Sequence, residues 1–269
     1  MTSARVDQAA RFRALHDGPA LLVLPNAWDA GSARIIEQAG ARAIATSSAA
    51  VAWGHGYPDG QALPLDILIA TVRAIVRVVG VPVSADIEAA YARDAATAAA
   101  TASRVVDAGG VGISVEDGAE APDLLCAKVE GIKAAARRAG VDLWVNARTD
   151  VHLRGLVPAA SALAEAVARG RRYHDAGADS VFVPGLVEER DLARFVADVP
   201  APLNVLAWPG LPTAGALEQL GVRRLSVGTA IAQAAYGRMY QSARAFLGVD
   251  AMEEPSFSVS DLNSLMRNA

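Results

Sequence analysis

Short apolar runs alternate with longer stretches of helical periodicity along the chain, and Gly, Pro or Asp marks each boundary. The strand-like runs are continuously apolar, which is typical of parallel strands buried on both faces by helices. The pattern occurs eight times. The predicted strands are Leu21–Asn26, Ala43–Ser48, Val81–Asp86, Val111–Glu116, Leu143–Ala147, Ser180–Val183, Leu203–Ala207 and Arg224–Val227.

A helical segment follows each predicted strand. These segments are expected to begin near Asp29, Pro64, Asp94, Pro122, Ala159, Glu189, Thr213 and Thr229. Five of them end at a glycine followed by a new apolar run, the pattern of a helix C-cap, at Gly40, Gly80, Gly140, Gly177 and Gly221. Eight such units close most simply as a (β/α)8 TIM-type barrel of the α/β class, with a doubly wound open sheet as the alternative.

The domain organisation follows from the length and from the continuity of this pattern. No linker or low-complexity segment divides the 269 residues, and a single β/α barrel needs about 250. We therefore expect residues 1–269 to form one barrel domain. The C-terminal tail, 252–269, lies beyond the eighth unit and contains a helix-like run over Ser260–Arg267. We expect this tail to pack on the barrel or on a neighbouring subunit.

Composition and charge exclude several classes of partner. The chain has 25 Lys and Arg against 29 Asp and Glu, a net charge of −4, and no basic cluster, which argues against nucleic-acid binding. The N-terminus, Met1–Leu15, has no apolar core of signal-peptide length, and no apolar run elsewhere is long enough for a membrane span. The one cysteine, Cys126, cannot form an intramolecular disulfide, which is typical of a reducing compartment. We expect a cytoplasmic protein.

Candidate chemistry lies at the carboxyl ends of the strands, where β/α barrels place their active sites. Asp86 and Glu88, two residues apart, lie on one face after the third strand, and Glu116 ends the fourth. Three neighbouring carboxylates repel one another unless protons or a cation intervene. Oxygen ligands without a His or Cys cluster suit Mg²⁺, or Mn²⁺, better than Zn²⁺.

A basic side chain follows the fifth strand on the opposite side of this acidic group. Arg148 could bind a substrate carboxylate through its planar fork, or it could neutralise Glu116 or Asp150 in a structural ion pair. Ser47 and Ser48, after the second strand, could donate hydroxyl and backbone N–H groups to the same carboxylate, or could simply fit a tight strand end.

Other polar residues receive structural interpretations. We expect Asp117 to be a helix N-cap or a solvated turn residue, because Gly118 follows it. Both lysines, Lys128 and Lys133, fall in a helical segment, so a Schiff-base mechanism has no obvious amine. Cys126 lies in the same segment and is expected to be a small buried hydrophobe rather than a nucleophile.

Two histidines are candidate acid–base groups. His55 lies between two glycines in the loop after the second strand, a setting in which histidine is more often exposed than catalytic, and His152 lies just past the fifth strand. His16 and His174 are expected on the surface.

Several motifs, taken in order, resemble those of the isocitrate lyase/phosphoenolpyruvate mutase superfamily. They are Leu-Pro-Asn-Ala-Trp-Asp (24–29), Thr-Ser-Ser-Ala (46–49), Gly-Tyr-Pro-Asp-Gly (56–60), Ala-Asp-Ile-Glu-Ala-Ala-Tyr (85–91), Val-Glu-Asp (115–117) and Asn-Ala-Arg-Thr-Asp (146–150). The resemblance implies a β/α barrel that exchanges its last helix between paired subunits in a homo-oligomer, a dimer or a tetramer. It also implies Mg²⁺ bound together with a small 2-oxo or 2-hydroxy carboxylate.

The resemblance also implies roles for individual residues. Asp86 corresponds to the metal ligand that also meets the substrate, and Glu88 and Glu116 would act on the metal through bound waters. The substrate carboxylate would be held by the residues Thr46, Ser47, Ser48 and Arg148. Asp59 corresponds to an acid close to the bound substrate in several members of the superfamily.

The chain departs from the superfamily pattern at two places. The Lys-Arg/Lys-Cys-Gly-His loop of the lyases and the gating-loop Lys of the mutases and phosphonopyruvate hydrolases are both absent after Glu116-Asp117. The usual Gly-x-Gly after the second acid is replaced by Ala90 and Ala92 around Tyr91, which narrows the freedom of the backbone there.

The expected activity is therefore carbon–carbon bond cleavage or decarboxylation through a metal-stabilised enolate, with His55, Asp59 or Tyr91 as the acid–base group and Arg148 as a catalytic partner. Three alternatives remain open. They are a weakly catalytic protein that binds Mg²⁺ and oxo acids, a phosphonopyruvate-type C–P bond enzyme, and a scaffold whose acids are structural.

Overall fold

The computed structural model describes residues 3–248 and 257–267, with side chains from residue 6 onward. In this part of the chain nine parallel strands form one sheet, in the order β1-β9-β8-β7-β6-β5-β4-β3-β2. Because β1 and β2 are consecutive in the chain, this order closes on itself, so the predicted barrel is confirmed and the open doubly wound sheet is wrong. The strands are β1 (Leu22–Leu24), β2 (Asn26–Ala27), β3 (Ile44–Thr46), β4 (Val83–Asp86), β5 (Gly112–Glu116), β6 (Trp144–Arg148), β7 (Ser180–Phe182), β8 (Leu203–Leu206) and β9 (Arg224–Ser226).

The barrel closes at Pro25, which divides the predicted first strand into β1 and β2. Proline has no backbone N–H for the ladder, and on either side of it β1 pairs with β9 while β2 pairs with β3. Asn26 secures the closure. Its Nδ2 donates to the Thr46 carbonyl at 2.8 Å, and its Oδ1 accepts from the backbone N–H groups of Val227 and Gly228 at 3.0 and 2.9 Å.

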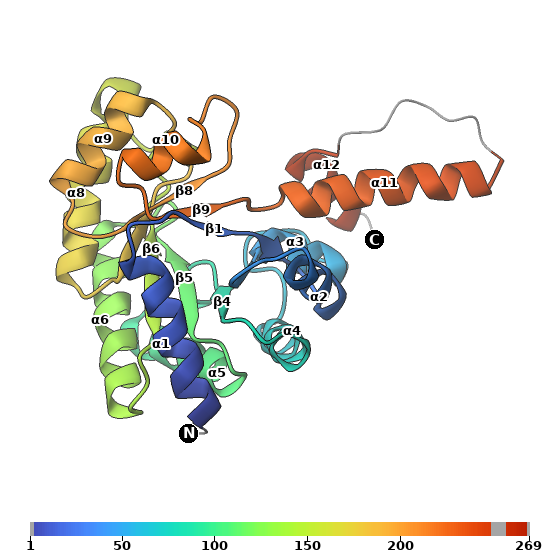
Figure 1. The fold of residues 1–269 in the computed structure, drawn as a ribbon, viewed down its shortest axis with the longest axis horizontal. Helices are drawn as coiled ribbons and strands as arrows, with labels where there is room; N and C mark the ends of the chain where they lie inside the picture. Colours follow the sequence, from blue (N-terminus) through green and yellow to red (C-terminus); the bar gives the residue numbers. More distant parts are fainter. Residues whose placement is uncertain (1–2, 249–256, 268–269) are drawn as a thin grey trace.

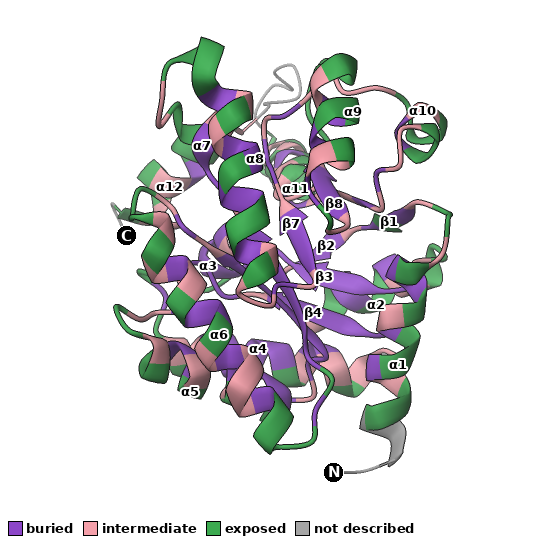
Figure 2. Cartoon of the chain, turned by 90° about the vertical axis from the view of Figure 1, so that its left-hand side faces the viewer, coloured by how far each residue is buried: buried purple, intermediate pink, exposed green. Residues whose placement is uncertain are grey.

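The eight expected helices are present, and all but α11, which extends away from the barrel, cover its outside with their buried faces toward the strands (Figures 1 and 2). They are α2 (Ala30–Gln38), α4 (Leu65–Val78), α5 (Ala95–Asp107), α6 (Pro122–Arg138), α8 (Ala159–Asp175), α9 (Glu189–Asp198), α10 (Ala214–Gln219) and α11 (Ala230–Phe246). Asp29, Asp94 and Thr213 cap α2, α5 and α10 by accepting backbone N–H bonds. Three helices that we did not predict are also present, α1 (Ser3–Asp17), α3 (Ser48–Gly54) and α7 (Val151–Arg154).

Four of the five predicted glycine caps are confirmed. Gly40, Gly140, Gly177 and Gly221 have positive φ values of 101°, 66°, 102° and 88°, which favour glycine over any other residue. The prediction for Gly80 is wrong. The chain leaves α4 at Val79 in an extended conformation, with φ −117° and ψ 148°, so no left-handed cap is needed there.

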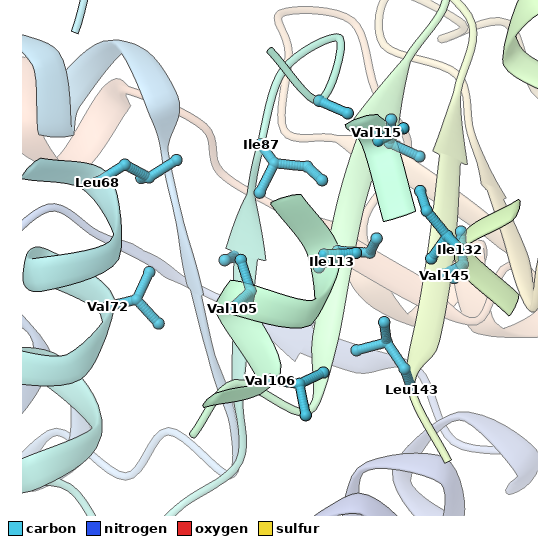
Figure 3. Close-up of a cluster of buried hydrophobic side chains, with 14 of the residues drawn as sticks. Leu68, Val72, Ile87, Val105, Val106, Ile113, Val115, Ile132, Leu143 and Val145 are labelled. Atoms are coloured by element: carbon cyan, nitrogen blue, oxygen red, sulfur yellow. The ribbon is translucent and has the colours of Figure 1, made fainter. Parts of the chain in front are cut away.

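The largest part of the core lies between β4–β6 and the helices α4–α6 (Figure 3). Ile113 and Val145 project outward from their strands, and Val72, Val105 and Ile132 meet them from the helices; all five side chains are almost fully buried. Packing of this density fixes the height and direction of the strands, and it therefore fixes where the carboxyl ends of β4, β5 and β6 lie.

Helix α1 covers the amino-terminal end of the barrel. Phe12 is fully buried against residues at the starts of the strands, and the His16 ring stacks on Trp144 with centroids 4.1 Å apart. The prediction that His16 lies on the surface is therefore wrong, since only 1% of it is exposed. Its Nδ1 lies 2.9 Å from the Phe12 carbonyl oxygen, and both burial, the larger effect, and Arg224 lower the pKa of His16 to about 3. His174 is half-buried.

At the other end of the chain, α11 extends away from the barrel, and α12 (Val259–Arg267) lies beside it (Figure 1). The expected helix over Ser260–Arg267 is therefore present, whereas positions 252–256 of the predicted tail lie outside the described residues. Helix α12 packs on α3, and the Asn263 Oδ1 accepts from the Trp53 indole N–H at 2.8 Å. In the described part of the chain, no helix is both long and apolar enough to cross a membrane.

Candidate active site

A cavity of about 350 Å³ opens at the carboxyl ends of the strands, the size of a site for a small ligand. Its lining includes six residues that the sequence predicts in the site: Thr46, Ser47, Ser48, Asp59, Asp86 and Arg148. The lining also includes the apolar residues Leu153, Phe182, Pro184, Leu206, Trp208 and Val259. The cavity therefore combines charged groups with apolar surface that can contact a carbon chain.

Asp86 ends β4 and is oriented by neutral groups alone. Its Oδ2 accepts from the Ser48 backbone N–H at 3.2 Å, and its Oδ1 accepts from the Glu88 N–H at 3.1 Å. Its own backbone N–H donates to the Thr46 hydroxyl oxygen at 2.8 Å. Within the residues that the structure describes, no basic side chain forms an ion pair with this carboxylate. Asp86 thus faces the cavity without an ion-pair partner among the described residues.

Glu88 lies behind Asp86 and is 94% buried, with 6% of its surface exposed. Its Oε2 accepts from the Gln61 N–H at 2.6 Å, and the Tyr91 hydroxyl donates to Oε1 at 3.4 Å. Burial raises the pKa of Glu88 to about 8, and the charges of Asp59, Asp86 and Glu116 act in the same direction. Burial, and then the charge of Asp86, also raises the pKa of Asp59.

Arg148, at the end of β6, forms the structural ion pairs that the sequence left open and also lines the cavity. Its Nη1 pairs with Glu116 at 2.8 Å and its Nε pairs with Asp150 at 2.7 Å, while the side chain also lines the cavity. Arg154 makes a second ion pair with Asp150 at 2.8 Å. The two carboxylates hold the guanidinium plane in one orientation, ready to meet an anionic group in the cavity.

The acidic half of the cavity fits a divalent cation. Within residues 3–248 and 257–267, no three His, Cys, Asp or Glu side chains are placed to bind one ion directly. Mg²⁺ does not require such a cage, because it keeps several of its waters and takes one or two carboxylates. Burial first, and then the charges of neighbouring carboxylates, raise the pKa values of Asp59 and Glu88, and a cation beside these acids would favour their charged forms. The residues present therefore fit Mg²⁺.

The loop after β4 keeps a left-handed backbone although it lacks the usual glycines. Glu88, Ala90 and Tyr91 have positive φ values of 51°, 67° and 52°. Each costs about 1–3 kcal/mol in a non-glycine residue, so other contacts must hold the loop. One of them comes from Lys128 on α6, whose Nζ donates to the Ala89 carbonyl at 2.9 Å. The sequence analysis missed this function of Lys128.

Three acid–base candidates lie outside the residues that line the cavity. The His55 Nε2 lies 2.9 Å from the Thr71 hydroxyl oxygen on α4, and His152 packs against Gly185. Tyr91 reaches the site only through Glu88, and burial raises the pKa of its hydroxyl well above the usual range. Of the acid–base candidates, the structure places Asp59 in the cavity wall.

The prediction for Asp117 is wrong. This residue is 2% exposed, and its Oδ2 accepts from Arg169 Nη1 at 2.8 Å and from the Tyr173 hydroxyl at 2.5 Å. Its Oδ1 accepts from the Asp150 N–H at 2.9 Å, and α6 begins later, with Ala121 as its N-cap. Asp117 points outward from the end of β5 and joins it to α8 and to Asp150.

The remaining groups near α6 keep their structural interpretation. Lys133 pairs with Asp179 at 2.8 Å, away from the cavity. Cys126 is a free cysteine and half-buried, and burial raises the pKa of its thiol, which disfavours a reactive thiolate.

Fold and site together define an α/β barrel with an acidic cavity at the carboxyl ends of its strands. The model of the phosphoenolpyruvate phosphomutase family matches residues 12–247, and the chain belongs to this family. The resemblance to the isocitrate lyase/phosphoenolpyruvate mutase superfamily is thereby confirmed.

Relatives and solved structures agree with this assignment. An uncharacterized protein of Mycobacterium tuberculosis is 36% identical over 223 residues, which cover 81% of each chain. A 2-methylisocitrate lyase of Bacillus subtilis is 29% identical and covers 75% of this chain and 67% of its own. A structure from Burkholderia cenocepacia superposes with a TM-score of 0.83 at 34% identity and covers 91% of this chain and 99% of that one. A phosphonopyruvate hydrolase solved with oxalate and Mg²⁺ has a TM-score of 0.79 at 25% identity, covering 97% and 95%.

Proposed function

We propose that this protein is a Mg²⁺-dependent lyase or decarboxylase that cleaves a carbon–carbon bond in a small 2-oxo or 2-hydroxy carboxylate. The observation that carries the proposal is Asp86, which faces the cavity without a basic partner and within reach of a substrate that Arg148 can bind. Relatives named as carbon–carbon lyases and a related structure that holds oxalate and Mg²⁺ support it.

In this proposal Asp86 holds the ion directly, and Glu88 and Glu116 hold it through waters. Bound Mg²⁺ supplies Lewis-acid stabilisation of the negative charge that develops on the 2-oxo oxygen. Ser47, Ser48 and Arg148 orient the substrate carboxylate, since each lines the cavity beside Asp86. Orientation of this kind contributes to catalysis because the reacting bond is then held at a defined angle to the carbonyl group.

The chain itself must handle a proton when the bond breaks. In a 2-oxo acid, the electron pair of the broken bond moves toward the carbonyl oxygen, and the carbon of the resulting enolate is then protonated. In a 2-hydroxy acid, a base removes the hydroxyl proton as the C–O bond becomes a carbonyl, and the electron pair leaves on the departing carbon, which is then protonated. Asp59 is the acid–base group in our proposal, because it lines the cavity and because burial together with the charge of Asp86 raises its pKa above the usual value of an aspartate. The Asn263 Oδ1 of α12 accepts from the Asp59 N–H at 2.9 Å and so positions this loop.

One observation favours a second candidate, a protein that binds Mg²⁺ and oxo acids with weak turnover. The connection from Asp117 to α6 is short and holds neither the cysteine nor the lysine of the superfamily gating loop. Such a protein would bind substrate analogues normally but release products slowly.

The test is a Mg²⁺ and substrate titration of the wild type and of Asp86→Ala. We expect Mg²⁺ to raise the thermal midpoint of the wild type and to permit release of pyruvate or CO₂ from one of a panel of three- to six-carbon oxo acids. Asp86→Ala should lose the Mg²⁺ effect and about 100-fold or more of the activity. Asp66→Ala, which removes an exposed acid on α4, is the control and should change neither.

The outcomes of this test separate the candidates. Mg²⁺-dependent binding without product release would support the binding protein. If Asp86→Ala kept both the Mg²⁺ effect and the turnover, the metal-dependent proposal would be wrong.

We also propose that the protein forms a homo-oligomer, a dimer or a tetramer, through α11. This helix extends beyond the barrel (Figure 1), and Met239, Tyr240, Phe246 and Leu247 on it or next to it are exposed. A cluster of large apolar side chains in water is typical of a surface that another subunit covers.

A further inference from the structure

Arg224 is a buried cation that the proposed mechanism does not use. It begins β9, only 3% of it is exposed, and its side chain lines the same cavity as Asp86 and Arg148. Its Nε and Nη1 have no hydrogen-bond partner, and within the described residues no carboxylate forms an ion pair with it.

An arginine in this setting is unusual, because buried charges are normally paired. Burial lowers the pKa of Arg224 to about 9, and the more distant charge of Asp86 acts in the opposite direction. The side chain is therefore still a cation near neutral pH. The described part of the chain therefore supplies no acceptor for these N–H donors of the buried guanidinium.

Two other buried side chains also have unused donors. Ser84, two residues before Asp86 on β4, lines the same cavity, and its hydroxyl has no partner. Asn204 is the direct partner of Arg224 in the β8–β9 register; its Oδ1 accepts from the Ser226 hydroxyl at 3.1 Å, and its Nδ2 has no partner. Unused hydroxyl, amide and guanidinium donors beside one cavity fit a negatively charged acceptor.

The position of Arg224 indicates which part of a ligand it would meet. In the closed barrel only β1–β2 and β3 separate β9 from β4, so Arg224 and Asp86 line the same cavity without lying on adjacent strands. Of the two arginines that line this cavity in the described part of the chain, Arg148 already pairs with Glu116 and Asp150. Arg224 is therefore left for a second carboxylate, which a ligand with one carboxylate does not supply.

We infer that Arg224 binds the second carboxylate of a dicarboxylate substrate, whose 2-oxo end lies at Asp86 and Arg148. This inference rests on the proposed function and specifies its substrate class. Arg224 is then a specificity-determining residue, because it separates dicarboxylates from monocarboxylates that share the same 2-oxo end.

The experiment compares the binding of pyruvate with that of oxaloacetate and 2-oxoglutarate. The three share a 2-oxo carboxylate, and only the last two carry a second carboxylate. Affinities are measured by calorimetry with Mg²⁺ and again with a chelator, for the wild type, Arg224→Met, Arg224→Lys and Arg224→Gln. The matched control is Arg223→Met, because the neighbouring Arg223 donates to the Pro19 and Val222 carbonyls instead.

We expect the wild type and Arg223→Met to bind at least one dicarboxylate about 10- to 100-fold more tightly than pyruvate, the effect of a charge-assisted hydrogen bond. Arg224→Met and Arg224→Gln should lose this preference and keep the affinity for pyruvate. Arg224→Lys, which keeps the charge but not the planar fork, should retain part of it.

The unfolding temperature of Arg224→Met provides a second measurement. Loss of a purely structural arginine would lower this temperature, whereas loss of an unpaired ligand-binding arginine would not. Without ligand, Arg224→Met should unfold at the same temperature as the wild type or at a higher one, because it removes an unpaired buried charge. Conversely, a lower unfolding temperature would make Arg224 a structural residue and overturn the inference.

The remaining outcomes are equally decisive. An equal loss of affinity for all three acids in Arg224→Met, or no preference in the wild type, would overturn the inference and leave the proposed function intact. If Mg²⁺ affects no ligand, the proposed function fails, yet a dicarboxylate preference that Arg224→Met removes would still support this role of Arg224. A dependence of wild-type stability on chloride, without a dicarboxylate preference, would assign Arg224 to an inorganic anion and overturn it.

Discussion

At the scale of single residues, the direction in which a side chain points from its strand decides its role. Glu116 and Asp117 are consecutive acids after the same apolar strand, and successive side chains of a strand point to opposite faces. Glu116 therefore meets Arg148 at the cavity, while Asp117 meets Arg169 and Tyr173 behind the sheet. The sequence predicted two acids at a strand end, but Asp117 could not be assigned because its partners follow it by more than fifty positions.

The prediction at this scale concerns Asp117. Asp117→Ala removes the buried one of the two carboxylates that pair with Arg169, and it leaves the Tyr173 hydroxyl buried without its acceptor, so we expect a loss of about 3–5 kcal/mol in the free energy of unfolding. Urea unfolding measures this loss. The control is Glu165→Ala, which removes the partly exposed partner of Arg169 and should cost about 1 kcal/mol or less. Equal losses in the two variants would contradict the interpretation.

At the scale of elements, the strands and outer helices were predictable from local patterns. Each has an apolar run and a boundary residue, such as Asp29 or Asp94 as an N-cap. Helix α1 was missed because its buried face is short. The apolar residues of that face are buried only because the helix covers the amino-terminal end of the barrel. His16 on this helix looks like a surface residue in the sequence and becomes a core residue only when Trp144 covers it.

The prediction at this scale is a dependence of stability on pH. His16 stays neutral in the folded protein, with a pKa of about 3, whereas an unfolded histidine takes up a proton below about pH 6.5. The unfolded state then binds more protons, so this contribution to stability is complete above pH 6.5 and is lost as the pH falls toward 3. For one proton the loss approaches about 1.4 kcal/mol per pH unit.

The measurement is the free energy of unfolding in urea at pH 7, 6 and 5. His16→Asn should be less stable than the wild type at pH 7 but should lose less stability on acidification. An identical pH dependence in the two proteins would show that His16 is not responsible.

At the scale of the whole molecule, the chain forms the predicted barrel, and its sheet closes on itself. The closure depends on Pro25 and Asn26, which join the first strand to both of its neighbours. The exposed apolar surface of α11 is the feature that the barrel leaves unexplained, and our proposed homo-oligomer accounts for it.

The prediction at this scale is an oligomer larger than the monomer in light scattering coupled to size-exclusion chromatography. The double substitution Phe246→Glu and Leu247→Glu should shift the protein toward the monomer, because it places two charges in the surface that a partner covers. Ile35→Glu, at an exposed apolar position on α2, is the matched control and should leave the mass unchanged. A monomeric wild type would refute the proposal.

The sequence by itself determined the barrel, most of its helices and the acidic strand ends. These depend on periodicity, capping and the rule that barrel sites lie at the carboxyl ends of strands, all of which act over a few residues. Asp86 and Arg148 could be placed near one another on that basis, whereas Asp59 was placed beside them only by the resemblance to the superfamily.

Only the tertiary structure decided which of these charged groups have a partner. Arg148 has ion-pair partners, whereas Asp86 and Arg224 have none among the described residues. These differences depend on side chains that are distant in the sequence and come together only in the barrel. Burial and pairing set the energy of a charge, and both are properties of the packed molecule rather than of a segment of chain.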